Sequence, residues 1–131
     1  MGEDRKFLGN HWLVQYKKCN AGIDSGRLVI DNPEHLEKIL IHSVESVNAK
    51  VLHSACYQFS PQGATAFVLI AESHLSIHTW PEYNCAAFDF FTCSKDMDGD
   101  FIVNYIKEEL GAGEMFISKK IRYDSIIQDE S

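Results

Sequence analysis

The chain has 131 residues, of which 45% are hydrophobic, and this is enough for one compact domain over 1–131 with its own core. It carries 12 Lys and Arg against 19 Asp and Glu, a formal net charge of −7, which excludes a sequence-independent grip on nucleic acid phosphates. No apolar run near the N-terminus is long enough for a signal peptide or a membrane helix. We therefore expect a cytoplasmic protein with no nucleic acid and no membrane as partner.

Periodicity and turn residues divide the first half of the chain into a strand, a helix and a hairpin. Asn32 followed by Pro33 is typical of a helix N-terminus, and apolar residues at helical spacing extend this helix to about Asn48. The expected elements are, in order, a frayed end over 1–6, a strand over 9–19, a loop over 20–26, the helix over 33–48, and strands over 51–60 and 64–71 joined by a turn at 61–63.

The second half is predicted in the same way. Its elements are strands over 73–80 and 85–92 joined by a turn at 81–84, a helix over 101–110, a strand over 114–122, and a loose tail from residue 124. We expect Asp98 or Asp100 to cap this helix, and Gly111 and Gly113 to end it. Its predicted apolar face comprises Phe101, Ile102, Tyr105, Ile106 and Leu110.

Strands outnumber helices in this assignment, and each helix has a single apolar face. The pattern predicts an α+β fold: a two-layer α/β sandwich with a largely antiparallel sheet and two helices on one face. The edges of such a sheet favour pairing with a second copy. The acidic bend over 95–100 lacks the spacing of an EF-hand loop, so a calcium site is not expected there.

The twelve residues from Ala71 to Glu82 concentrate hydroxyl, imidazole, indole and carboxylate groups. Strand alternation places one set on one side and a second set on the other: Ser73, Leu75, Ile77 and Thr79, against His74, Ser76, His78 and Trp80. A serine near histidines leaves two mechanisms open, a hydrolase nucleophile or attack by the serine on its own preceding peptide bond. The hydrolase alternative is weak because the chain has no Gly-x-Ser-x-Gly elbow.

Metal binding is a further alternative for this stretch. His74 and His78 could ligate a metal, with Glu72 or Glu82 as a third ligand. In a strand, however, their Cβ atoms would lie roughly 13 Å apart at ~3.3 Å per residue, which is too far for one ion. We therefore expect no metal site.

The remaining candidates have both a packing and a functional interpretation. The four cysteines are scattered without a Cys-x-x-Cys pair, and free thiols are expected in a reducing cytoplasm. Among them, Cys93 follows an apolar strand and is as compatible with a buried thiol as with a reactive one. Composition alone favours core packing for Phe59 and Trp80 and a plain turn role for Glu82.

The stretch Glu72 to Tyr83 reads ESHLSIHTWPEY, with FSPQG at 59–63 before it and FTC at 91–93 after it. In these residues the chain closely resembles the short prokaryotic S-adenosylmethionine decarboxylase proenzymes. The resemblance spans roughly 9–122 and is dense between Phe59 and Cys93. It implies pyruvoyl-dependent decarboxylation of S-adenosyl-L-methionine to the aminopropyl donor of spermidine synthesis, in a homodimer or higher oligomer of αβ units.

The resemblance also implies autocatalytic cleavage between Glu72 and Ser73, giving a β chain 1–72 and an α chain 73–131. Ser73 would attack the preceding carbonyl, and elimination and hydrolysis would convert it to a pyruvoyl group, which forms a Schiff base with the substrate and replaces pyridoxal phosphate. A tight bend before the strand would strain the bond to be cleaved. His78 would accept the α-proton of the serine during processing, and Cys93 would donate a proton in decarboxylation.

Substrate contacts follow from the same resemblance. Phe59 and Trp80 would stack on adenine and attract the sulfonium cation. Glu82 would accept hydrogen bonds from both ribose hydroxyls, which favours a nucleoside substrate. The alternatives are a pyruvoyl-dependent arginine or ornithine decarboxylase, or an unprocessed, non-enzymatic homologue.

The chain departs from the common pattern of these proenzymes at several positions. Thr65 stands where many members carry serine, and its help in processing is an open question. Asn84 and Cys85 replace the more usual Gly-Tyr pair. Gln15 and Lys17-Lys18 also depart from a commoner first strand. These changes are expected to alter a pocket wall or an interface.

Overall fold

The computed structural model describes residues 4–130. Positions 1–3 of the predicted frayed end over 1–6 lie outside these residues. Seven strands form the main sheet: β1 (Phe7–Cys19), β4 (Val51–Gln58), β5 (Ala64–Ile70), β6 (Ser73–Trp80), β7 (Cys85–Thr92), β8 (Ala112–Tyr123) and β9 (Ile127–Glu130). Their order is β4-β5-β6-β7-β1-β8-β9, and every neighbouring pair is antiparallel. The predicted strands 73–80 and 85–92 are confirmed at both ends.

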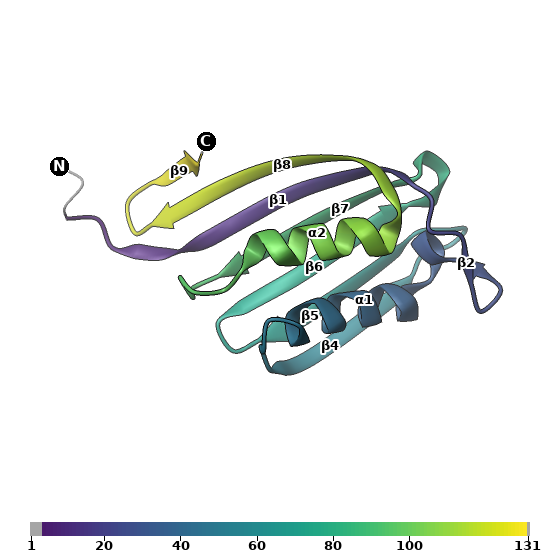
Figure 1. Ribbon diagram of the computed structural model, residues 1–131, viewed down its shortest axis with the longest axis horizontal. Helices are drawn as coiled ribbons and strands as arrows, with labels where there is room; N and C mark the ends of the chain where they lie inside the picture. Colours follow the sequence, from purple (N-terminus) through teal and green to yellow (C-terminus); the bar gives the residue numbers. More distant parts are fainter. Residues whose placement is uncertain (1–3, 131) are drawn as a thin grey trace.

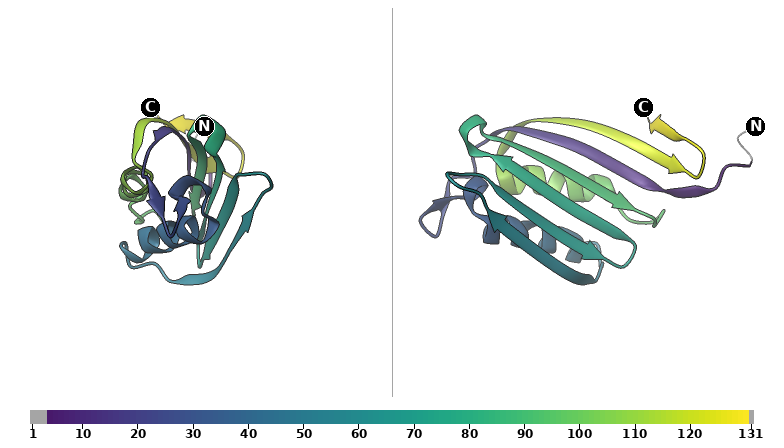
Figure 2. Two further views of the ribbon diagram at one scale, coloured as in Figure 1. Left: turned by 90° about the vertical axis from the view of Figure 1, so that its right-hand side faces the viewer. Right: turned by 180° about the vertical axis from the view of Figure 1, so that it is seen from behind.

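Two helices, α1 (Pro33–Glu45) and α2 (Gly99–Leu110), lie side by side on one face of this sheet (Figures 1 and 2). The other face carries no helix in the described part of the chain. The arrangement confirms the predicted two-layer α+β fold. No helix among the described residues is long and apolar enough to cross a membrane.

The N-terminus of α1 forms as its sequence predicts. Pro33 occupies the first helical position, and the Asn32 side chain accepts a hydrogen bond from the His35 backbone N–H at 3.2 Å. The helix ends at Glu45, three residues earlier than expected, because the chain turns over 46–48 and Asn48 is left-handed. Its buried face consists of Pro33, Leu36, Ile39, Leu40, Ser43 and Val44.

Of the two predicted caps for α2, Asp98 is the one that acts, since it accepts from the Phe101 N–H at 3.0 Å. Asp100 instead accepts from the Trp12 indole N–H at 3.2 Å. The predicted apolar face is partly wrong: Val103 is buried, whereas Phe101 is exposed. The face that packs on the sheet includes Gly99, because the Trp12 ring lies where a Cβ at this position would stand.

Three further expectations are corrected at the chain's connections. The predicted loop over 20–26 contains a short strand, β2 (Ile23–Asp24), which pairs with β3 (Arg27–Leu28) just after the loop. Gly113 lies inside β8, so Gly111 alone ends α2. The tail is not loose over 127–130, because β9 pairs with β8 and its acidic side chains meet Lys119 and Lys120.

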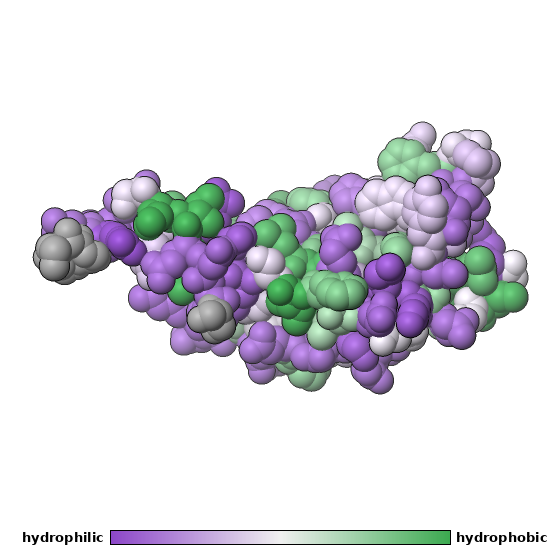
Figure 3. All heavy atoms as spheres, turned by 90° about the horizontal axis from the view of Figure 1, so that it is seen from above, coloured by the Kyte–Doolittle hydropathy of each residue, from purple (hydrophilic) through white to green (hydrophobic). Residues whose placement is uncertain are grey.

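Alternation gives the main sheet two different faces. One face lies under the helices and buries the large side chains Trp12, Val14, Tyr16, Leu75, Ile77, Phe88 and Phe90. The opposite face, here called the open face, presents His74, Ser76 and His78 of β6, as the alternation in 73–80 predicts. From above, on the side of β8 and β9, the surface is largely hydrophilic with a few separate hydrophobic groups (Figure 3).

Candidate active site

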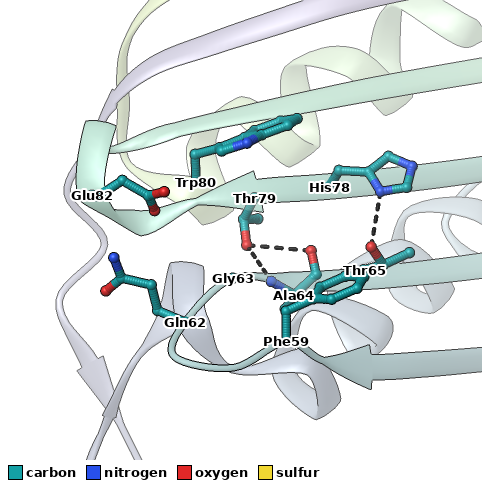
Figure 4. A pocket seen from close by; sticks show the side chains of 9 residues that line it. All are labelled: Phe59, Gln62, Gly63, Ala64, Thr65, His78, Thr79, Trp80 and Glu82. Carbon is teal, nitrogen blue, oxygen red and sulfur yellow. Dashed lines mark hydrogen bonds between the residues drawn. The ribbon is translucent and has the colours of Figure 1, made fainter.

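A pocket of about 300 Å³ lies where β5 begins and β6 ends (Figure 4). Its lining comprises Phe59, Gln62, Gly63, Ala64, Thr65, His78, Thr79, Trp80 and Glu82. The Phe59 and Trp80 side chains are 48% and 41% exposed, so core packing, which composition favoured, is wrong for both. The pocket therefore joins two aromatic rings, one imidazole and one carboxylate at a single end of the sheet.

The His78 imidazole is held by a cross-strand hydrogen bond. His78 and Thr65 face each other on β6 and β5, and Nδ1 of the ring lies 2.8 Å from Thr65 Oγ1 (Figure 4). The hydroxyl that threonine retains at this position thus fixes the orientation of the ring. The second nitrogen, Nε2, makes no hydrogen bond with any of residues 4–130.

The Glu82 carboxylate is carried by η3 (Pro81–Tyr83), a short 3-10 helix that follows Trp80. The turn ends at Asn84, whose φ of 51° is left-handed. Glycine and asparagine both adopt this conformation readily, so the exchange of the usual glycine for Asn84 preserves the turn. Nothing in the structure explains the change at Cys85.

The bond predicted to be cleaved lies at the opposite end of β6. Ala71 and Glu72 form an exposed two-residue loop between β5 and β6, and Ser73 is the first residue of β6. The Glu72 carbonyl oxygen accepts a hydrogen bond from the Cys93 backbone N–H at 2.9 Å. The structure therefore brings Glu72, Ser73 and Cys93 together.

Ser73 itself is 6% exposed, and its Oγ donates to Met97 Sδ at 3.9 Å on the helix-covered side. The Cys93 side chain is exposed and unpaired. None of residues 71–73 is left-handed, so the expectation of a strained bend has no support in the backbone angles.

Ser73 and His78 are not brought together within one chain. They are five residues apart on one strand, roughly 16 Å at ~3.3 Å per residue, and an odd separation places their side chains on opposite faces. The predicted residues thus form two groups. The cleavage end contains Glu72, Ser73 and Cys93, and the pocket end contains Phe59, His78, Trp80 and Glu82.

A third polar group, missed in the sequence, lies on the open face between these ends. His11 of β1 and His74 of β6 place Nε2 atoms 2.7 Å and 3.4 Å from Asp89 Oδ2 on β7. Burial tends to raise the pKa of Asp89, but hydrogen bonds from His11 and Ser76 and the charges of both histidines lower it to about 2. The sequence signal that could have indicated this group is Asp89 itself, the single charged residue in the largely apolar strand 85–92.

Two imidazoles and a carboxylate are also donors that suit zinc or iron, and their ligand atoms lie within 4.8 Å of one another. The hydrogen bonds from His11, His74 and Ser76 already satisfy this carboxylate, however. His74 is therefore paired with Asp89 and separated from His78, with which a shared metal had been considered.

Comparison with known proteins gives one consistent result. The family described as S-adenosylmethionine decarboxylase matches residues 10–123. An S-adenosylmethionine decarboxylase proenzyme of Thermosipho melanesiensis is 37% identical over 123 residues, covering 92% of this chain and 90% of that protein. One of Caldicellulosiruptor saccharolyticus is 42% identical over 108 residues, 82% of each. The crystal structure of the adenosylmethionine decarboxylase from Aquifex aeolicus is 33% identical, with a TM-score of 0.75 over 96% of this chain and 98% of that one.

Proposed function

The chain belongs to the S-adenosylmethionine decarboxylase family, and on this basis we propose that it cleaves itself between Glu72 and Ser73 and then decarboxylates S-adenosylmethionine. The product would serve as the aminopropyl donor for spermidine synthesis. The four unpaired cysteines are compatible with a reducing compartment, and the proposal places the reaction in the cytoplasm.

The first step is attack by Ser73 Oγ on the carbonyl carbon of Glu72. The new C–O bond forms as the C–N bond to Ser73 breaks, which moves the acyl group from nitrogen to oxygen. Negative charge develops on the Glu72 oxygen, to which the Cys93 N–H donates at 2.9 Å. This donor supports the assignment because a fixed N–H at a developing oxyanion lowers the barrier to acyl transfer.

The second step is β-elimination, in which His78 is the proposed base that removes the Ser73 α-proton. The Cβ–O bond of the ester breaks and the Glu72 α-carboxylate leaves, and hydrolysis of the resulting dehydroalanine gives the pyruvoyl group and ammonia. Nδ1–H of the ring donates to Thr65 Oγ1 in this assignment, and Nε2 accepts the proton. Because His78 lies at the far end of β6 on the other face, the base acting on one Ser73 would come from a second copy.

The open face offers the surface for this second copy. This face exposes large apolar side chains, which a partner surface would cover. They are Leu13, Phe67, Leu69 and Trp80, each 36–41% exposed. A two-fold axis that runs between two such faces, across the strands, would set the pocket end of one chain over the cleavage end of its partner. The proposed dimer thus contains two complete sites.

The residues at the cleavage end fit a pyruvoyl group. Ser73 begins β6 and follows an exposed loop, so cleavage before it would free a strand end while leaving the strand pairing intact. When formed, this group supplies a carbonyl that binds the substrate amine and accepts the electrons released with CO₂. Cys93 Sγ would then deliver a proton to the substrate carbon that has lost CO₂, since the Cys93 side chain is exposed beside this strand end.

The pocket end would bind the adenosyl group. Phe59 and Trp80 present aromatic faces that suit adenine and a sulfonium cation, and the carboxylate of Glu82 suits two ribose hydroxyls. The single observation that carries the proposal is this joint placement in one pocket. A free amino acid has no ribose for Glu82 to bind, so arginine and ornithine are not favoured.

The test is release of CO₂ from S-adenosylmethionine, arginine and ornithine, assayed side by side with the matured protein. We expect activity with S-adenosylmethionine alone, together with an intact mass that shows two fragments and a pyruvoyl group at position 73. Release of CO₂ from arginine or ornithine only would contradict the assigned substrate. A single uncleaved chain without activity would contradict the proposal that the protein is an enzyme.

A further inference from the structure

We propose that Asp31 is a positioning residue of the pocket, which holds the loop Phe59–Gly63 in the shape that binds the adenosyl group. This inference rests on the proposed function for its effect on the substrate, but the contacts themselves are independent of it. Asp31 does not line the pocket and lies far from it in the sequence.

One carboxylate oxygen makes the decisive contacts. Asp31 Oδ1 accepts from the Gly63 backbone N–H at 2.8 Å and from Gln58 Nε2 at 2.9 Å. The same Gln58 nitrogen donates to the Gly63 carbonyl at 2.8 Å and lies 3.3 Å from the Phe59 carbonyl. Both ends of the loop are therefore tied to Asp31, directly at Gly63 and through Gln58 next to Phe59.

Asp31 is itself held by structure on the helix-covered side of the sheet. It is the last residue of η2 (Val29–Asp31), and Arg27 donates to its backbone carbonyl at 2.8 Å. The next residue, Asn32, caps α1. The carboxylate is thus fixed by a helix start that does not depend on the loop, as a positioning group requires.

The loop that Asp31 holds supplies Phe59, Gln62 and Gly63 to the pocket (Figure 4). Gly63 is buried and left-handed, with φ +102°, and a Cβ there would meet the Thr79 carbonyl oxygen at 3.1 Å. Little room is therefore left for the loop to move toward β6. Loss of the Asp31 contacts would let it move outward, carrying the Phe59 ring away from Trp80.

The Gln58 side chain is oriented by its amide nitrogen and not by its amide oxygen. Its Oε1 is buried, and no group among the described residues donates to it, whereas its Nε2 contacts Asp31, Phe59 and Gly63. Burying an amide oxygen without a partner is unfavourable. The orientation of this side chain is therefore set by what its nitrogen binds, above all by the Asp31 carboxylate.

The primary test is Asp31→Ala in the full-length, self-matured protein. Because the His78 imidazole, the proposed processing base, is oriented by Thr65 and not by this loop, processing should proceed near the parent rate, while KM for S-adenosylmethionine rises about tenfold with little change in kcat. Asp31→Asn keeps an oxygen that accepts both hydrogen bonds and should recover most of the loss. The matched control is Asp24→Ala, which removes a nearby carboxylate that contacts His35 and no pocket residue.

A readout without substrate separates this inference from the proposed function. Amide hydrogen exchange at Gly63 should be at least tenfold faster in Asp31→Ala than in the parent, and unchanged in Asp24→Ala. Gln58→Ala is the second variant if Asp31→Ala fails to fold, with faster exchange again expected. Unchanged exchange and unchanged KM would overturn the role of Asp31. Suppose that exchange at Gly63 is faster in Asp31→Ala, but that the parent protein itself never decarboxylates S-adenosylmethionine. This result would support the loop contact and would overturn only the proposed function.

Discussion

The two ends of β6 differ in what they are made of. The cleavage end is defined by backbone groups, a two-residue loop and the Cys93 N–H bound to the Glu72 carbonyl at 2.9 Å. The pocket end is defined by side chains, which line a cavity of about 300 Å³ and are oriented by Thr65 and Asp31. In the proposed function, covalent chemistry and substrate recognition are therefore separated within one chain, and a complete site would require two chains.

The largest effect is expected from Ser73→Ala, which removes the attacking oxygen at the cleavage end. The protein should remain one chain of 131 residues on denaturing gels and release no CO₂, because neither the ester nor the pyruvoyl group can form. Ser76→Ala, on the same strand but the open face, should still cleave. Two fragments in the Ser73 variant would contradict the assigned nucleophile.

Cys93→Ala tests whether the cleavage end acts through its side chain as well as its backbone. The backbone N–H that binds the Glu72 carbonyl remains, so self-cleavage should continue. Decarboxylation should fall by about 10²-fold to 10⁴-fold, since a positioned proton donor is lost. Cys85→Ala is the matched thiol control and should retain activity. A Cys93 variant with parent-like turnover would remove this thiol from the chemistry.

Glu82→Gln tests the pocket end alone. The variant should cleave itself normally, and KM for S-adenosylmethionine should rise roughly tenfold, because an amide accepts hydrogen bonds from the ribose hydroxyls more weakly than a carboxylate does. The assay should include arginine as a substrate without ribose. Slow processing together with unchanged KM would reverse the assignment of Glu82 to recognition.

The smallest effect is expected on the open face, at Asp89 of β7 and its histidine partners His11 and His74. The pKa of Asp89 is about 2, below its ordinary value of 3.8, so its stabilisation is complete above about pH 4 and is lost as the pH falls through 2. Asp89→Asn should reduce stability at pH 7 by roughly 1 kcal/mol, a shift of a few degrees in Tm.

The same variant should also flatten the loss of stability between pH 4 and 2, measured by thermal unfolding across that range. Asp129→Asn, in an exposed ion pair with Lys120, is the control and should change stability by less than about 0.5 kcal/mol. Equal acid sensitivity in the parent and the Asp89 variant would show that this carboxylate does not contribute.

Much of the fold follows from local sequence patterns. Alternation predicts 73–80, an apolar run bounded by turn residues predicts 85–92, and Asn32-Pro33 predicts the start of α1. The pattern fails where long-range contacts decide. The charged segment 127–130 becomes a strand only because β8 is beside it, and α2 buries Gly99 and Val103 on the face that packs against the sheet.

The candidate site shows the same division. The residues near Ser73 and Trp80 are local in sequence, and their odd or even spacing already assigns them to faces of β6. The groups that orient them are not local. Asp31 is 32 residues from Gly63, and His11 is 78 residues from Asp89, so their contacts depend on the order of strands and on the helix layer.

The most direct test of the divided site is to combine two variants that are each inactive. Ser73→Ala and His78→Ala, co-expressed with different tags and purified as the mixed dimer, place one intact Ser73 opposite one intact His78. If the site is shared, as we propose, the mixed dimer should process one chain and recover up to half of the parent activity. If each chain supplies its own base, the mixed dimer will stay uncleaved and inactive.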